Sequence, residues 1–93
     1  MFYNALTGSG YSPKNVDRLM AEYDGPETDQ PIRVAGFRQW LKVGRVVRKG
    51  QHGHKIAMMV AKKVKAKDGE TERKQVMKLT TVFFEHQTTE LQQ

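Results

Sequence analysis

The sequence contains no cysteine, so disulfide bonds and thiolate metal sites are excluded and a reducing cytosol is the expected compartment. It also has no apolar run near the roughly twenty residues that a membrane-spanning helix needs. Its first residues, Met1 to Asn4, lack the basic and then apolar regions of a signal peptide. We therefore expect a cytoplasmic protein without a membrane partner.

Residue types that carry catalysis are scarce as well. Serine occurs only as Ser9 and Ser12, both in turn positions, and no acidic residue lies between Pro31 and Lys67 that could form a carboxylate pair there. His52 and His54 stand two apart in a basic, Gly-rich segment without a nearby carboxylate or thiol, a poor setting for a cation. No Walker motif is present. We predict that the protein is not an enzyme and binds no metal and no cofactor.

Positive charge, by contrast, is abundant and concentrated in the centre of the chain. The formal net charge is +6, but residues 1–30 sum to −3, residues 31–67 to +11 and residues 68–93 to −2. Such separation is typical of a polarised surface that binds a polyanion, and it favours nucleic acid over a solvated face that only aids solubility. The basic residues of the central stretch are Arg33, Arg38, Lys42, Arg45, Arg48, Lys49, Lys55, Lys62, Lys63, Lys65 and Lys67.

The length predicts one folded domain over residues 1–93, since 38% hydrophobic residues in a chain of this size support a single modest core. Residues Met1 to Gly10 are expected to form an irregular or extended lead-in. A first helix is predicted to begin at Ser12, whose hydroxyl can cap it, and to end at Asp24-Gly25-Pro26. Apolar residues at helical spacing give this helix a buried side.

A second, shorter helix is predicted at about Gly36 to Val43. Phe37 and Trp40 stand three apart and share a side, which more often indicates a core position than a platform for stacked bases. Arg38 and Lys42 stand four apart, so they share a face away from the aromatic side.

The segment from Gly44 to Gly53 is basic and punctuated by glycine, and we expect a short strand followed by a tight loop. Arg45, Arg48 and Lys49 can neutralise phosphates here, while glycines let backbone N–H groups approach an anion closely. His52 would add a hydrogen bond to a phosphate or simply line the loop. The alternative is an ordinary glycine-containing loop, and the pattern alone does not decide between the two.

A long β-hairpin is predicted in the second half, with His54 to Lys65 and Gln75 to Phe84 as strands and an Asp-Gly turn within Lys67 to Glu70. The polar tail, His86 to Gln93, is expected to fray. The predicted fold class is therefore α+β, with two short helices packed on a small antiparallel sheet that carries a long C-terminal β-hairpin.

These elements predict non-catalytic binding of nucleic acid through the basic helix face and the loop after it. Tyr11 and Trp40 are the rings predicted to stack on bases, as in proteins that bind single strands. An interaction or inhibitor module that docks its basic face on an acidic host protein remains the alternative. The residues predicted to contact nucleic acid are Arg38, Lys42, Arg45, Arg48, Lys49, His52 and Lys55.

Three motifs, in order, resemble the N-terminal domain of ArdC-type antirestriction proteins, and TraC-type plasmid primases carry a similar domain. In chain order they are Leu6-Thr7-Gly8 with Tyr11 and Asn15, then Phe37 to Leu41 followed by Gly44 to Gly53, and finally Val82 to Gln87. The resemblance implies an α+β domain that binds single-stranded DNA with little sequence preference, in a phage or plasmid setting within a bacterial host. RNA remains an alternative ligand.

ArdC-type proteins continue into a metallopeptidase domain with a His-Glu-x-x-His helix, and this sequence contains no such motif. The resemblance therefore does not imply protease or full antirestriction activity. The pattern agrees both with a free-standing version of the domain and with a fragment of a larger protein. It gives no indication of a homo-oligomer or of a particular protein partner.

Overall fold

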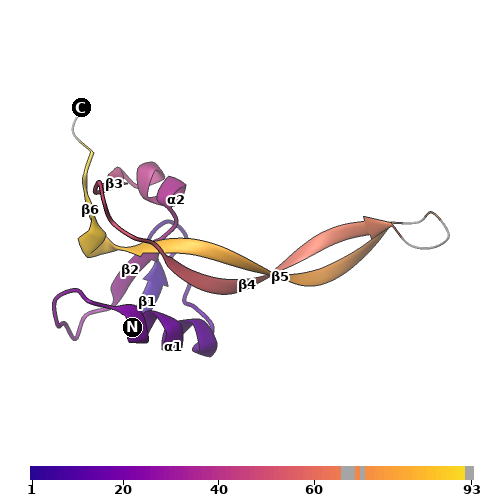
Figure 1. The fold of residues 1–93 in the computed structure, drawn as a ribbon, viewed down its shortest axis with the longest axis horizontal. Coiled ribbons are helices and arrows are strands. Elements are labelled where there is room, and N and C mark those ends of the chain that lie inside the picture. The colour runs from indigo at the N-terminus through magenta and orange to yellow at the C-terminus, as the bar shows by residue number, and fades with distance from the viewer. Residues whose placement is uncertain (66–68, 70, 92–93) are drawn as a thin grey trace.

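The computed structural model describes residues 1–65, 69 and 71–91, and it consists of a small body from which a two-stranded arm projects (Figure 1). The molecule measures 53 × 33 × 24 Å along its principal axes, and the arm accounts for the long dimension. The fold class predicted from the sequence, α+β, is confirmed. Neither helix of the described residues is long and apolar enough to cross a membrane.

The main sheet has four strands in the order β1-β2-β5-β4. It is mixed, whereas the sequence predicted an antiparallel sheet. β1 (Phe2–Asn4) runs parallel to β2 (Ile32–Ala35), with Phe2 opposite Ile32. β2 then pairs antiparallel with β5 (Thr71–Phe84) through two residues only. The sequence indicated only an irregular or extended segment around β1 and no strand at β2, because each strand is three or four residues long and is specified by pairing across the fold.

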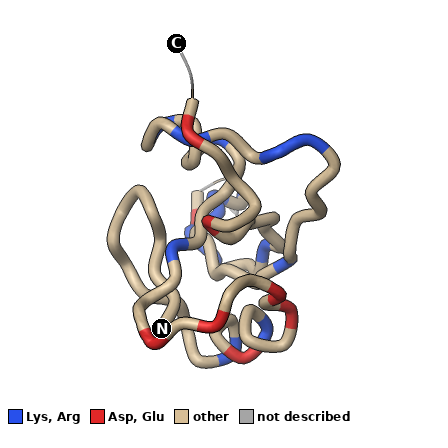
Figure 2. Tube along the Cα trace, turned by 90° about the vertical axis from the view of Figure 1, so that its left-hand side faces the viewer, with Lys and Arg blue, Asp and Glu red and all other residues tan. Residues whose placement is uncertain are grey.

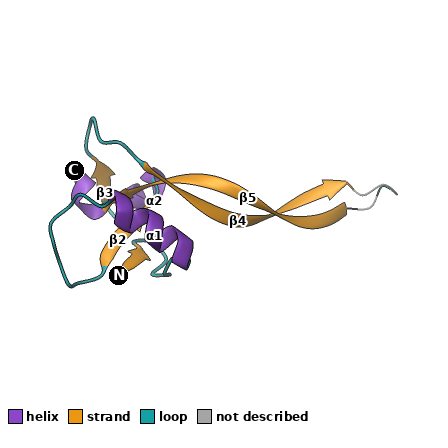
Figure 3. Ribbon diagram, turned by 60° about the horizontal axis from the view of Figure 1, so that its bottom comes forward, coloured by secondary structure: helices purple, strands orange, loops and turns teal. Residues whose placement is uncertain are grey.

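The predicted hairpin is confirmed, and it is longer than expected on its return side. β4 (His54–Lys65) pairs with β5 from His54 opposite Val82 to Lys65 opposite Thr71. The predicted turn, Lys67 to Glu70, lies outside the described residues apart from Gly69, whose φ of +87° is the left-handed region that glycine tolerates. Figure 3 shows the two strands leaving the helices and twisting around each other as a ribbon.

Helix α1 (Pro13–Glu22) covers the body end of the hairpin. The Ser12 hydroxyl accepts a hydrogen bond from the Asn15 N–H, as predicted for the cap. Leu19 is fully buried in the core. The Asn15 side chain exchanges two hydrogen bonds with the backbone of Ala57, at 2.7 and 3.0 Å, and so occupies the outer edge of β4. The hydrophobic cluster around Leu19 also contains Phe2, Val34, Ile56, Val82 and Phe84.

The C-terminal segment is ordered through its last described residues, so the prediction of a fraying tail is wrong there. A 3-10 turn, η1 (Glu85–Gln87), leads into β6 (Thr88–Glu90), which pairs antiparallel with β3 (Arg45–Val47). Gln87 is buried, with its Nε2 donating to the His52 carbonyl and its Oε1 accepting from the Phe84 N–H. Buried hydrogen bonds rather than apolar side chains fix this segment, which is why its polar composition was misleading.

Candidate nucleic-acid interface

The body is electrically polarised. Five acidic residues lie on α1 and the loop that follows, together with Lys14 and Arg18, whereas α2 (Phe37–Lys42) and the segment after it carry cations, with Glu90 of β6 opposite Arg45. Figure 2 shows the red positions mainly around the N-terminal side of the molecule and a run of blue on the opposite side. The acidic side comprises Asp17, Glu22, Asp24, Glu27 and Asp29.

Helix α2 presents its two cations to solvent as predicted. Arg38 and Lys42 are both exposed and lie one turn apart. Lys42 stands in the last turn, where the helix dipole favours a positive charge. The opposite side of the helix is fixed by Trp40, so both cations are available on a rigid support.

Some cationic side chains of the loop after α2 are hydrogen-bonded within the protein and others are not. The Arg45 guanidinium donates to the hydroxyl and the carbonyl oxygen of Thr88, at 2.8 and 3.2 Å, and one Nη of Arg48 donates to the His86 carbonyl at 2.9 Å. These arginines therefore hold the loop against the C-terminal segment, although a guanidinium has further N–H donors for an anion. Lys49 and His52 are exposed and have no side-chain hydrogen bond to another described residue.

Lys55 and Gly53 mark the place where this loop enters β4. The Lys55 ammonium is exposed and donates to the Thr81 hydroxyl on β5. A Cβ on Gly53 would lie 2.1 Å from the Thr81 Cγ2, so glycine is required by the close approach of β5. Gly50 has a φ of +84°, which a turn of this shape needs. Both glycines thus have a structural role, as in an ordinary glycine-containing loop, which is the alternative that the sequence left open.

The prediction that Trp40 offers a stacking surface is wrong. Its side chain is 0% exposed, and its indole N–H donates to the Phe83 carbonyl at 3.0 Å. The Arg33 guanidinium, which also pairs with Glu85, lies 5.6 Å from the centre of the Trp40 ring. Trp40 is therefore a core residue that anchors α2 to the body through its buried ring and its indole hydrogen bond.

Tyr11 is less exposed than the sequence indicated. Its ring packs against the core, and its hydroxyl donates to the Val34 carbonyl and accepts from the Asn4 amide, both at 3.2 Å. Burial raises the pKa of Tyr11, partly offset by the hydrogen bond from Asn4. The ring is held in the body and is only partly open to solvent.

The ring that the sequence analysis missed is Phe37. Its side chain is 48% exposed, and it meets Phe83 edge to face with the ring centres 6.5 Å apart. Phe37 and Trp40 follow the same helical pattern, which favoured a core position for both, and of the two only Trp40 was also predicted to stack on bases. No signal in the sequence separates the two rings, because tertiary packing decides which of them is buried.

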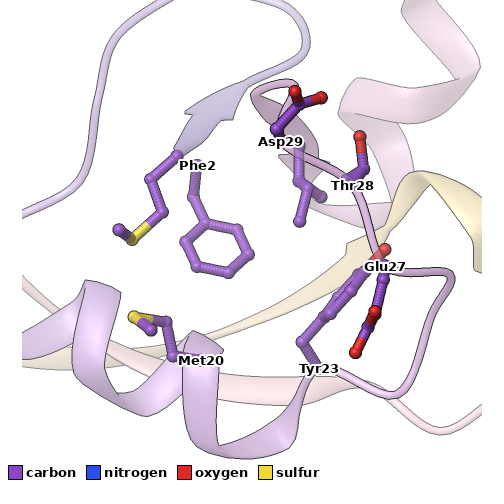
Figure 4. Close-up of a pocket in the computed structure, with 8 residues that line it drawn as sticks. Phe2, Met20, Tyr23, Glu27, Thr28 and Asp29 are labelled. Atoms are coloured by element: carbon purple, nitrogen blue, oxygen red, sulfur yellow. The ribbon is translucent and has the colours of Figure 1, made fainter.

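The pocket in Figure 4 lies on the acidic side and is a different kind of surface. It has a volume of about 730 Å³, and its lining includes the apolar Phe2 and Met20, the Tyr23 ring, and the carboxylates Glu27 and Asp29. These carboxylates repel phosphate groups. The pocket is therefore not part of the candidate interface.

The two histidines considered as metal ligands are separated in the structure. His52 is exposed in the loop, whereas His54 packs its ring on Phe84 and lies 3.4 Å from a Glu22 carboxylate oxygen. Among residues 1–65, 69 and 71–91, no three His, Asp or Glu side chains lie together in a way that could hold a metal ion.

Comparison with known proteins identifies the family. Residues 1–87 match the N-terminal domain of the anti-restriction factor ArdC. The crystal structure of the antirestriction protein ArdC from plasmid R388, in its metal-free form, superposes with a TM-score of 0.79 at 25% identity. The match covers 99% of this chain and 33% of that one, so this chain spans about a third of its length. Among curated proteins, none matches. The chain therefore belongs to the family of ArdC N-terminal domains.

Proposed function

We propose that this domain binds single-stranded DNA, without catalysis and with little sequence preference. The basic surface that would contact the strand consists of Arg38, Lys42, Arg45, Arg48, Lys49, His52 and Lys55. The observation that carries the proposal is the exposure of Arg38, Lys42 and Lys49 on α2 and its following loop, outside the acidic segment 17–29. The plasmid antirestriction protein that this fold resembles supports a nucleic acid as the ligand.

The shape of the basic surface favours a single strand over a duplex. Helix α2 has six residues, and its inner side is committed to the body by Trp40. It therefore offers too little exposed helix to read a major groove. Phe37, in contrast, displays an aromatic ring among the cations, and such a combination suits unstacked bases.

Fluorescence anisotropy with single-stranded DNA, duplex DNA and RNA across a salt series tests the proposal. The wild-type domain should bind the single DNA strand best, and binding should weaken with salt. Replacing Lys42 and Lys49 by Ala should lower the log–log salt slope by about 1.4, since each phosphate contact to a single strand contributes about 0.7. Both side chains are exposed, so the fold should be unaffected.

The matched control removes the same charge from the acidic side, through Lys14→Ala with Arg18→Ala on α1. This variant should keep nearly the wild-type slope and affinity. Equal losses in the two double variants would contradict the assignment of the basic surface, because total charge alone would then explain binding. If no strand binds at physiological salt, the proposal fails and the protein-interaction alternative is favoured.

A further inference from the structure

A groove lies beside Phe37, between α2 and the base of the arm. Its volume is about 360 Å³, within the range of pockets that hold small organic groups. Phe37, Arg38 and Gln39 line it from α2, and Asn4 and Tyr11 line it from the N-terminal segment. Strands β4 and β5 close the remaining side with Ile56, Met58, Thr80 and Val82.

Apolar atoms dominate the walls, and the outermost of them are open to solvent. Phe37 is 48% and Met58 43% exposed, whereas Ile56 and Val82 at the floor are buried. The edge contact with Phe83 holds the Phe37 ring in place, and almost half of its side chain remains free to receive a partner. A rigid ring beside an apolar floor is suited to a flat, unsaturated group.

The polar groups of the groove have a defined orientation. The Gln39 Oε1 accepts hydrogen bonds from the Gly36 N–H and the Asn4 Nδ2, both at 3.0 Å, which fixes which end of the amide is oxygen. The Gln39 Nε2 has no hydrogen-bond acceptor among the described residues. Gln39 lines the groove, so this donor is available to a ligand there, with the exposed Arg38 beside it.

We propose that this groove binds one unstacked nucleobase of the strand. The base stacks on Phe37, its edge accepts a hydrogen bond from the Gln39 Nε2, and Arg38 contacts an adjoining phosphate. Every base has an acceptor on its edge, so a single donor gives little sequence preference. The charge of Arg38 beside an apolar groove favours a base of an anionic strand over an apolar peptide. This inference rests on the proposed function and adds a base contact to its phosphate contacts.

The test compares an oligothymidylate with an oligonucleotide of equal length that lacks the bases but keeps every phosphate. Wild-type protein should bind the base-containing strand about tenfold more tightly, the effect expected of one stacked base. Phe37→Ala should lose that tenfold preference while keeping the same salt slope. Phe37→Trp should retain it, because a larger ring preserves stacking.

Leu41→Ala is the matched control, since Leu41 is an exposed apolar residue of the same helix that does not line the groove. It should bind both strands as the wild type does. Thermal melting followed by circular dichroism should be near wild type for all three variants. Equal wild-type affinity for the two strands, or an unchanged preference in Phe37→Ala, would overturn the groove and leave phosphate binding intact. Wild-type protein that binds neither strand would overturn both proposals.

Discussion

The body and the arm share the same two strands, yet side chains are buried at only one end of them. Ile56 of β4 and Phe84 of β5 are 0% exposed in the body. In the arm, defined as 58–65 of β4 with 71–78 of β5, Met59 is 61% and Met77 67% exposed although the two lie directly opposite each other. Isolated two-stranded hairpins are marginally stable in water, so the body supplies the stability and the arm depends on it.

Charge sharpens this difference between the two regions. Lys62 lies opposite Lys74, and Lys63 lies opposite Arg73, so like charges face one another across the arm. Cross-strand pairs of one sign destabilise a hairpin. In the body, by contrast, Arg33 pairs with Glu85 and also packs over an aromatic ring. The arm thus carries unbalanced positive charge that a polyanion would relieve.

The largest expected effect comes from two substitutions on the single strand β5. Phe84→Ala should lower the free energy of unfolding by about 3–5 kcal/mol, since it empties the centre of the core. Met77→Ala, seven residues earlier in the arm, should change it by about 0.5 kcal/mol or less. Urea unfolding of both variants measures the difference. Similar losses would show that the arm contributes to stability as the body does.

Asn15 tests the junction between the two regions. Its amide bonds both the N–H and the carbonyl of Ala57, close to the point where β4 leaves the body. Asn15→Ala leaves both backbone groups without these partners and should cost about 1–3 kcal/mol. The Ala57 amide should also exchange with solvent faster. Unchanged exchange at Ala57 would mean that the edge of β4 is protected without Asn15.

Removal of the arm should have a smaller effect on stability than Phe84→Ala or Asn15→Ala. Replacing residues 60–76 by Asn-Gly joins Met59 to Met77, which are already paired, through a two-residue hairpin turn. The free energy of unfolding should change by about 1 kcal/mol or less, because none of the arm side chains is buried. The salt slope for single-stranded DNA should fall by less than in the Lys42, Lys49 double variant. If the body no longer folds without the arm, the claim that the body supplies the stability is wrong.

The features that the sequence predicted correctly are long or locally encoded. Ser12 and the helical spacing of apolar residues predicted helix α1, and two runs of strand-forming residues predicted the hairpin. The features it missed depend on distant partners: β1 needs β2, and β6 needs β3. The cations of the candidate site were identifiable because charged side chains remain at the surface. Phe37 and Trp40 were not separable, since only tertiary packing decides which ring is buried.

The smallest predicted effect is an alkaline sensitivity located in the body. The pKa of Tyr11 is raised above its ordinary value near 10 because burial disfavours the phenolate. The folded state therefore holds this proton more tightly than the unfolded state, so the contribution is complete below pH 10 and is lost as the pH rises through the raised pKa. Ionisation also removes the hydrogen bond that the hydroxyl donates to Val34.

The Tyr11 ring is partly exposed, so the expected loss of stability between pH 9 and pH 11.5 is smaller than the loss in Asn15→Ala. Tyr11→Phe lacks the ionisable group and should lose less stability over that interval than the wild type, although it starts from a lower value at neutral pH. Tyr23, whose pKa is also raised by burial, accounts for part of what remains. If wild type and Tyr11→Phe lose the same stability across this interval, the alkaline sensitivity does not come from Tyr11. If the arm-deleted protein loses as much stability as the wild type, the sensitivity lies in the body.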